Sequence, residues 1–426
     1  GLRGPTTGGL NHLRNLSNSL LMIRHKMLTL QFVDKQVITN KECMTKDINS
    51  SPFDEGTKIK LDIFRRCFRE WYPVFVHDLY TTHLFVFDMF AGSGMDPEGH
   101  PGSPLILLDE AKGAMCQHCK SLKSNSNGKK VFFVFNEYLK PKYEALKNNV
   151  SDFQDQCMVS NNCSECPIKK GIRVRNEDFK DLLADDKIDK VLKNNEYGKF
   201  VLIDQYGIKQ VTEEVFSKLI SFPKTDFIFF ISSSTINRFK EFPAIQQYFD
   251  VKKINFDDAQ PKECHRLIKE YFEDLIPCGK DYYLHSFTIK KGSNYYGLIF
   301  GTSHSLGMEK FLKVCWEEDR LSGDSNCNID NDYEEGSLFY NESETQKKVT
   351  IKQEMTDSIL NGNIKDNISG LKYALRRGCQ PSLFVEVISS LKKRGKIDII
   401  GTFNSKATCI HKIKPDGKDY YRIRII

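Results

Sequence analysis

Apolar runs alternate with helical patterns over the first two thirds of the chain. Between Gly56 and Val76, apolar residues recur every three or four positions, which is the period of an amphipathic helix. The run 84–90 is apolar except for Asp88 and is followed at once by glycines, a pattern typical of a parallel strand covered on both faces. Further apolar runs lie at 131–135, 172–174, 200–203 and 227–231, separated by segments long enough for a helix. The pattern predicts an α/β, Rossmann-like fold with a mainly parallel sheet.

The pattern changes in the last third of the chain. Two strand-like segments around Lys290–Ser293 predict an antiparallel hairpin at the end of the sheet. Residues 321–350 are polar and acidic, as expected of a linker. Beyond them we expect three short helices, with a stop at Gly378, and then strands at 397–403, 407–413 and 419–426, which together indicate a small winged-helix domain. The predicted organisation is an N-terminal extension (1–54), an α/β domain (55–320), a linker (321–350) and a winged-helix-like domain (351–426).

Composition narrows the class of protein. With 426 residues, 40% of them hydrophobic and 12% aromatic, the chain is neither disordered nor fibrous. No apolar run reaches about 18 residues, so we expect no membrane-spanning segment. The net charge of +6 is mild, so a nucleic-acid surface would have to come from local clustering. Thirteen cysteines without a secretory signal predict a reduced, cytoplasmic protein, and we expect Met27 to lie near its natural start.

A glycine loop and two acidic residues form the first candidate site. Asp88 ends the first strand and is followed by Ala91, Gly92 and Gly94, where glycines let the backbone approach a ligand closely. Glu137 ends the second strand, where a carboxylate can accept hydrogen bonds from both hydroxyls of a ribose. Asp178, after the third strand, can accept from an adenine amino group, with Phe179 against the ring. The alternative is that Glu137 and Asp178 are solvated loop acids.

Several motifs in order resemble one family. The chain looks like the three-Cys-motif partner (TcmP) proteins, a bacterial group with a class I S-adenosylmethionine-dependent methyltransferase-like fold. The segments that carry the resemblance are Thr57–Lys60 with Trp71, FDMFAGSG (87–94), Gly102–Leu105, NEDF (176–179), DQYG (204–207) and GMEKFLKVCW (307–316). The resemblance covers roughly residues 55–318. It implies five parallel strands followed by an antiparallel hairpin. It also implies S-adenosylmethionine as the ligand, with Asp88, Ala91, Gly92 and Gly94 around its amino-acid end, and a partner protein encoded nearby.

The end of the fourth strand is the presumed catalytic position. Methyltransferases that act on exocyclic amines carry Asn or Asp, two prolines and an aromatic residue there, and the resembled family usually has Asp-Pro-aromatic-Gly. This chain has Asp204, Gln205 and Tyr206, so the turn lacks the proline that would make it rigid. Asp204 is expected to orient the acceptor or take its proton, and Tyr206 to stack on a flipped or unpaired base. The alternative is that Asp204 only caps the next helix.

Two C-x-x-C pairs form a candidate metal site. Cys116 with Cys119, and Cys163 with Cys166, could supply four thiolates to a structural zinc ion if the fold brings the pairs together. An iron–sulfur cluster remains open, and so do unrelated thiols. Other cysteines, such as Cys67 and Cys315, lie on apolar helix faces and are expected in the core.

The C-terminal domain carries a basic cluster. Residues 351–426 hold 15 Lys and Arg against 7 Asp and Glu. In a winged helix, the third helix enters the major groove and the hairpin contacts the backbone. The candidate nucleic-acid-binding residues are Lys392, Lys393, Arg394, Lys396, Lys412 and Lys414. The alternative is a solvated face used for protein contacts.

These patterns favour a methyltransferase that acts on or at nucleic acid, DNA more than RNA, in a bacterial defence or mobile-element module. A second hypothesis is a catalytically silent scaffold that binds S-adenosylmethionine and pairs with another protein. A third is a DNA-binding regulator whose α/β domain senses a metabolite.

Overall fold

The structure is a computed structural model of the chain. It describes residues 51–112, 129–160, 168–205, 207–257, 259–339 and 344–426. The account below concerns the unit that runs from Pro52 to Ile426.

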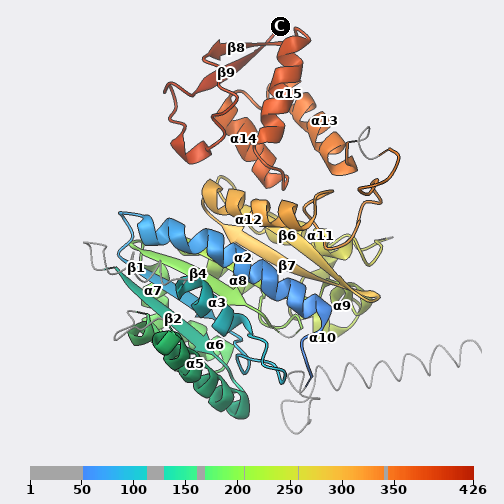
Figure 1. The fold of residues 1–426 in the computed structure, drawn as a ribbon. Coiled ribbons are helices and arrows are strands. Elements are labelled where there is room, and N and C mark those ends of the chain that lie inside the picture. Colours follow the sequence, from blue (N-terminus) through green and yellow to red (C-terminus); the bar gives the residue numbers. More distant parts are fainter. Residues whose placement is uncertain (1–50, 113–128, 161–167, 206, 258, 340–343) are drawn as a thin grey trace, which may run out of the picture. The chain divides into compact units, whose positions relative to one another are not determined.

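A seven-stranded sheet forms the centre of the α/β domain (Figure 1). Its strand order is β3-β2-β1-β4-β5-β7-β6. The first five strands are parallel, whereas β7 is antiparallel to both β5 and β6. The strands are β1 (His83–Asp88), β2 (Lys130–Asn136), β3 (Ile172–Arg175), β4 (Tyr197–Ile203), β5 (Thr225–Ile231), β6 (Tyr283–Lys291) and β7 (Asn294–Thr302). The prediction of a parallel sheet that ends in an antiparallel hairpin is confirmed.

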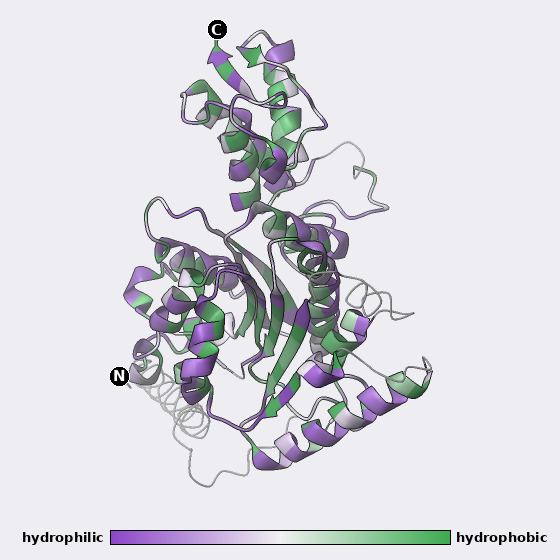
Figure 2. Cartoon of the chain, turned by 90° about the vertical axis from the view of Figure 1, so that its left-hand side faces the viewer, coloured by the Kyte–Doolittle hydropathy of each residue, from purple (hydrophilic) through white to green (hydrophobic). Residues whose placement is uncertain are grey.

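Helices cover both faces of the sheet. One face is covered by α2 (Glu55–His77), α3 (Ser103–Lys112), α5 (Lys140–Ser160) and α12 (Ser305–Glu318). The other is covered by α6 (Phe179–Ala184), α7 (Asp186–Lys193), α8 (Glu213–Ser221), α9 (Ser233–Arg238), α10 (Pro243–Gln246) and α11 (Cys264–Asp274). Figure 2 shows hydrophobic strands between helices that carry hydrophilic residues. Because both faces are covered, the strands lack polar alternation, as their sequence indicated.

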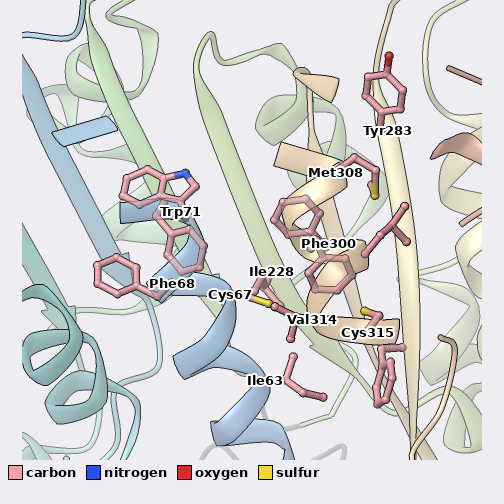
Figure 3. Packing of buried hydrophobic residues seen from close by; sticks show 14 of the residues in the cluster. Ile63, Cys67, Phe68, Trp71, Ile228, Tyr283, Phe300, Met308, Val314 and Cys315 are labelled. Atoms are coloured by element: carbon pink, nitrogen blue, oxygen red, sulfur yellow. The ribbon is translucent and has the colours of Figure 1, made fainter. Parts of the chain in front are cut away.

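Helix α2 is the amphipathic helix predicted at the start of the domain. Asp54 caps it by accepting a hydrogen bond from the Thr57 N–H, at 2.9 Å. Its apolar stripe, including Phe64, Phe68 and Trp71, is buried against the sheet and α12 (Figure 3). Full burial of one such side chain contributes roughly 1.5–3 kcal/mol, so this stripe holds the helix across the sheet.

The polar segment that we expected to be a linker contains a packed part. Asp324 is 8% exposed and forms ion pairs with Arg266 of α11, at 3.0 Å, and Lys347, at 2.6 Å. Its carbonyl accepts a hydrogen bond from the Thr288 N–H of β6. Asp319 accepts from several backbone N–H groups of the same loop. Polar residues therefore attach this stretch to the sheet through hydrogen bonds and ion pairs.

The C-terminal region consists of three helices and a two-stranded antiparallel sheet. These are α13 (Gln346–Leu360), α14 (Asn367–Arg376), α15 (Ser382–Lys393), β8 (Ile397–Gly401) and β9 (Tyr421–Ile425). Gly378 has a positive φ of 69° just after α14, as expected of a helix stop. The strand predicted at 407–413 is wrong. The segment contains a 3₁₀ turn, Ile410–Lys412, because Ile410 and Ile413, three residues apart, are both buried. Whether this arrangement acts as a winged helix stays a prediction.

Candidate functional site

The carboxyl ends of β1 and β4 lie at the point where the strand order reverses. Strand β1 pairs with β2 on one side and with β4 on the other, so the connections after β1 and β4 run to opposite sides. In open α/β sheets, ligands bind in the crevice at this switch point. The candidate residues Asp88 and Asp204 both follow strands that end there.

The glycine loop after β1 is held tightly. The Ala91 N–H donates to the Asn136 carbonyl at 2.8 Å, and the Gly102 N–H donates to the Gly94 carbonyl at 2.8 Å. Gly92 and Gly94 have φ values of 60° and 80°, which L-residues with side chains rarely adopt. The loop therefore requires glycine at both positions, and it leaves backbone groups at the crevice rather than side chains.

Asp88 is a buried carboxylate with an unsatisfied oxygen. Its side chain has 0% exposure, and Oδ1 accepts a hydrogen bond from the Phe90 N–H at 3.2 Å. Oδ2 meets no hydrogen-bond donor among the described residues. Burial, with a smaller contribution from the charge of Asp204, raises the pKa of Asp88 to about 7, although a hydrogen bond from Ser103 opposes the shift. The carboxylate is therefore suited to a ligand that brings a positively charged donor.

Asn136 joins the ends of three strands and was not singled out from the sequence. It is 2% exposed, and its amide donates to the carbonyls of Met89 (3.3 Å) and Glu177 (3.0 Å). Its Oδ1 accepts from the Glu177 N–H at 3.1 Å. Because these bonds tie the segments after β1 and β3 to β2, Asn136 sets the position of the neighbouring Glu137. The signal available in the sequence was a polar residue at the end of an apolar run, FFVFN, because a polar side chain buried there must find hydrogen-bond partners.

Glu137, Asp178 and Phe179 lie where the sequence predicted, at the ends of β2 and β3. Glu137 is half-buried, and its Oε1 accepts from the Leu139 N–H at 2.7 Å. Asp178 caps α6 by accepting from the Lys180 N–H at 2.8 Å. The Phe179 ring is only 2% exposed and packs on Phe90, with ring centroids 5.1 Å apart. Phe90 is the more exposed of the two rings, so it offers the accessible aromatic surface here.

Asp204 at the end of β4 forms an ion pair with Lys60 of α2. The Lys60 ammonium lies 2.8 Å from Oδ1 and 2.6 Å from Oδ2, with both side chains mostly buried at 14% and 16% exposure. The same ammonium lies 4.9 Å from the ring centroid of Phe230, which stacks on Tyr296 at 5.6 Å. Asp204 does not cap the next helix, because α8 begins at Glu213 with Thr212 as its cap. The carboxylate thus has a cation and an aromatic pair beside it.

Gln205 takes over the structural role of the missing proline. It is 1% exposed, its Nε2 donates to the Phe230 carbonyl at 3.1 Å, and its Oε1 accepts from the Gln210 N–H at 2.8 Å. These two bonds join the segment after β4 to the end of β5 and fix the turn. Tyr206, the other predicted catalytic residue, lies outside the described residues.

The six basic candidates of the C-terminal region are exposed. Lys392, Lys393 and Arg394 lie at the end of α15, and Lys396, Lys412 and Lys414 follow. In the part of the chain that the structure describes, none of the six forms an ion pair, whereas nearby Arg422 and Arg424 pair with Asp416 and Asp398. These unpaired cations leave a positive surface.

The predicted zinc ligands Cys116, Cys119, Cys163 and Cys166 lie outside the described residues. Within the described ranges, no group of three or more His, Cys, Asp or Glu side chains could hold a metal ion. Cys67 and Cys315 are buried at 5% and 1% exposure, as expected of core residues. None of the described helices has the length and apolar character needed to cross a membrane.

Comparison with known proteins gives fold likenesses only. No protein-family model matches the sequence, so membership of the three-Cys-motif partner family stays a prediction. No curated protein matches it either. Among solved structures, Trm1 from Pyrococcus horikoshii in complex with S-adenosyl-L-methionine is 11% identical, over 64% of this chain and 61% of that chain, with a TM-score of 0.33. This chain therefore spans about three fifths of Trm1. A further similar structure is TYW2 from M. jannaschii in complex with AdoMet, which is 12% identical over 60% of this chain and 78% of that chain, with a TM-score of 0.27. Another is the O-methyltransferase TomG from Streptomyces achromogenes in complex with SAM, which is 9% identical over 61% of this chain and 98% of that chain, with a TM-score of 0.27.

Proposed function

We propose that this chain is an S-adenosylmethionine-dependent methyltransferase that acts on nucleic acid. The observation that carries the proposal is the buried Asp88 carboxylate, with one unsatisfied oxygen, beside a glycine loop at the switch point of the sheet. An aliphatic ammonium group supplies the donor that Asp88 lacks, and the amino-acid end of S-adenosylmethionine carries such a group.

The remaining residues of the crevice fit the other parts of this cofactor. Glu137 would accept hydrogen bonds from the ribose hydroxyls, and Asp178 would accept from the adenine amino group. Ala91, Gly92 and Gly94 would let the backbone lie close to the amino-acid end, and Phe90, which packs on the buried Phe179, would form the apolar wall for the base. S-adenosylmethionine supplies an electrophilic methyl group when bound.

The acceptor would lie near Asp204. Its carboxylate can accept a hydrogen bond from an amine of the acceptor, which orients the nitrogen lone pair, and can hold the proton that the amine loses. The ion pair with Lys60 holds the Asp204 carboxylate in place, and Gln205 holds the turn that follows it. Tyr206 and Phe230 would stack on the acceptor base.

The six exposed basic residues from Lys392 to Lys414 would bring the enzyme to nucleic acid, DNA more than RNA. Because these six side chains are exposed and none forms an ion pair in the described structure, they are available to phosphates. Binding would weaken steeply with salt, since each phosphate contact releases a counterion.

Titration calorimetry with S-adenosylmethionine and S-adenosylhomocysteine tests the cofactor site. The unchanged chain should bind both ligands, and Glu137→Ala should weaken binding by roughly 10–100-fold if the ribose loses both of its acceptors. Glu144→Ala, an exposed residue on α5, is the matched control and should bind as the unchanged chain does. Absence of binding to the unchanged chain would refute the proposal.

The Lys60–Asp204 pair favours a second candidate, a scaffold that binds the cofactor without transferring its methyl group. An aspartate whose two oxygens already accept hydrogen bonds from an ammonium has less capacity to bind the amine of an acceptor. Transfer of labelled methyl groups to DNA and RNA, compared between the unchanged chain and Asp204→Asn, separates the two. Methylation that is lost in Asp204→Asn supports the enzyme, whereas cofactor binding without any methylation supports the scaffold.

Four further proposals rest on the sequence and its resemblance to three-Cys-motif partner proteins. We propose a cytoplasmic location, a partner protein encoded nearby, a role in a defence or mobile-element module, and a structural zinc ion held by Cys116, Cys119, Cys163 and Cys166. Metal analysis of the purified chain, before and after replacement of Cys116 and Cys119 by Ser, tests the zinc proposal.

A further inference from the structure

A cavity lies near the ends of the parallel strands that are opposite to the candidate cofactor site. Its volume is about 500 Å³, within the range of small-molecule sites. It lies between the C-terminal half of α2, the start of β5, the end of β7 and the start of α12. Because β5 begins there, the cavity lies near the amino ends of the parallel strands, whereas Asp88 and Asp204 lie at their carboxyl ends. None of the residues assigned to the cofactor lines this cavity.

The walls of the cavity are largely apolar and include five Trp, Phe and Tyr side chains. Trp71 and Phe75 of α2 lie with ring centroids 4.6 Å apart, and Phe300 and Phe311 stack at 4.4 Å. Figure 3 shows Trp71 and Phe300 projecting from α2 and β7, with Cys67 lying between them in that view. Aromatic faces carry negative partial charge and attract cations.

Asp226 lines the same cavity and is an unpaired buried carboxylate. It is 4% exposed, and its Oδ2 accepts a hydrogen bond from the Trp71 indole N–H at 2.8 Å. The Thr302 hydroxyl also donates to it, and burial nevertheless raises the pKa of Asp226 to about 6. Both donors are neutral, and no cation forms an ion pair with Asp226 in the described residues. A buried carboxylate is costly to ionise unless a positive charge is placed beside it.

The two lysines that line the cavity have other partners. Lys310 pairs with Glu70 at 2.5 Å. Lys224 lies 3.5 Å from the Tyr80 carbonyl and 3.7 Å from Asp78. The cavity therefore combines aromatic side chains with the buried carboxylate of Asp226, whereas its other carboxylate, Asp78, and its two lysines already have partners.

We propose that this cavity binds a small organic ammonium ion with an apolar or aromatic body, its cation against Asp226 and its body against the aromatic walls. A bound ammonium would supply the charged partner that Asp226 lacks and would gain cation–π attraction from Trp71. A carboxylate ligand would meet repulsion from Asp226, and a neutral ligand would leave the carboxylate without a counter-charge.

A set of three indoles with different head groups tests this on the unchanged chain by titration calorimetry. Tryptamine carries an ammonium, tryptophol a hydroxyl and indole-3-propionate a carboxylate on the same ring. Tryptamine should bind at least ten-fold more tightly than either of the others at pH 7.5. Equal binding of the three, tighter binding of the carboxylate, or no binding of tryptamine would each overturn the proposal.

Two variants determine which of the two sites binds tryptamine. Asp226→Asn keeps the size of the side chain and should weaken tryptamine binding at least ten-fold. Asp88→Asn removes the buried carboxylate at the opposite edge and should leave tryptamine binding unchanged. The reverse pattern would assign the amine to the cofactor crevice and refute the inference. If Asp226→Asn fails to fold, Asp88→Asn still decides: tryptamine binding that persists in this variant supports the cavity, and binding that is lost refutes the inference. The outcome does not depend on S-adenosylmethionine binding, so this inference and the proposed function can fail separately.

Discussion

Replacing Asp88 by Asn should stabilise the ligand-free protein, and the gain should grow with pH. Asp88 is fully buried, and its pKa is raised from 3.8 to about 7 because burial penalises the charged form. A raised pKa means that the folded state binds the proton more tightly than the unfolded state does. The cost of ionising Asp88 is therefore absent well below pH 3.8, grows between pH 3.8 and about 7, and is complete above it.

The size of the effect follows from that shift. About three units of pKa correspond to roughly 4 kcal/mol at high pH, and roughly 2–3 kcal/mol of this appears between pH 5 and pH 8. Asn cannot ionise, so the variant escapes this cost. The new amide introduces a constant penalty of roughly 1–3 kcal/mol if its N–H groups find no acceptor, and that penalty does not change with pH.

Urea unfolding of both proteins at pH 5, 6, 7 and 8 measures the effect. The difference in free energy of unfolding, variant minus unchanged chain, should rise by roughly 2–3 kcal/mol across this range. Asp152→Asn, an exposed residue on α5, changes the net charge equally and should give a nearly constant difference. A difference for Asp88→Asn that stays flat within about 0.5 kcal/mol would show that the carboxylate is not penalised by burial, and the reasoning would be wrong.

Three other changes give further tests. Gln205→Ala removes both hydrogen bonds that hold the turn after β4, so it should lower the free energy of unfolding by roughly 1–3 kcal/mol in urea titrations. Trp71→Phe removes a donor to Asp226 and should destabilise by a similar amount at pH 8 but less at pH 5, where Asp226 is protonated; unfolding at the two pH values checks this. Neutralising 392–394 with Ala should reduce the salt dependence of nucleic-acid binding by about three units of log–log slope, measured by fluorescence anisotropy.

The sequence determined the elements of the α/β domain. Continuous apolar runs marked the five parallel strands, because strands covered on both faces need no polar alternation. The glycines after Asp88 and the acidic residues Glu137 and Asp178 fell at strand ends, and the structure places them at the same edge of the sheet. Local pattern suffices for these features, since strand and turn formation depend on neighbouring residues.

The pattern of apolar residues gave wrong predictions where polar contacts or short turns determine the local structure. The stretch around Asp324 read as a linker, yet it is attached to the sheet by ion pairs with Arg266 and Lys347. The segment 407–413 read as a strand, yet it contains a 3₁₀ turn. The contacts of Asp324 join residues that are distant in the sequence, and the 3₁₀ turn depends on two apolar residues three positions apart. The alternation of polar and apolar residues, which marks a strand, indicates neither kind of contact.

The chemistry of the sites was decided by the tertiary structure. Lys60 pairs with Asp204 across 144 positions of sequence, and Asn136 links segments that follow three different strands. Asp226 was not singled out from the sequence, and it is the packing of α2 that buries it against Trp71 at the edge of a cavity. A residue's charge can be read from the sequence, whereas its partners and its exposure to water depend on which distant elements pack against it.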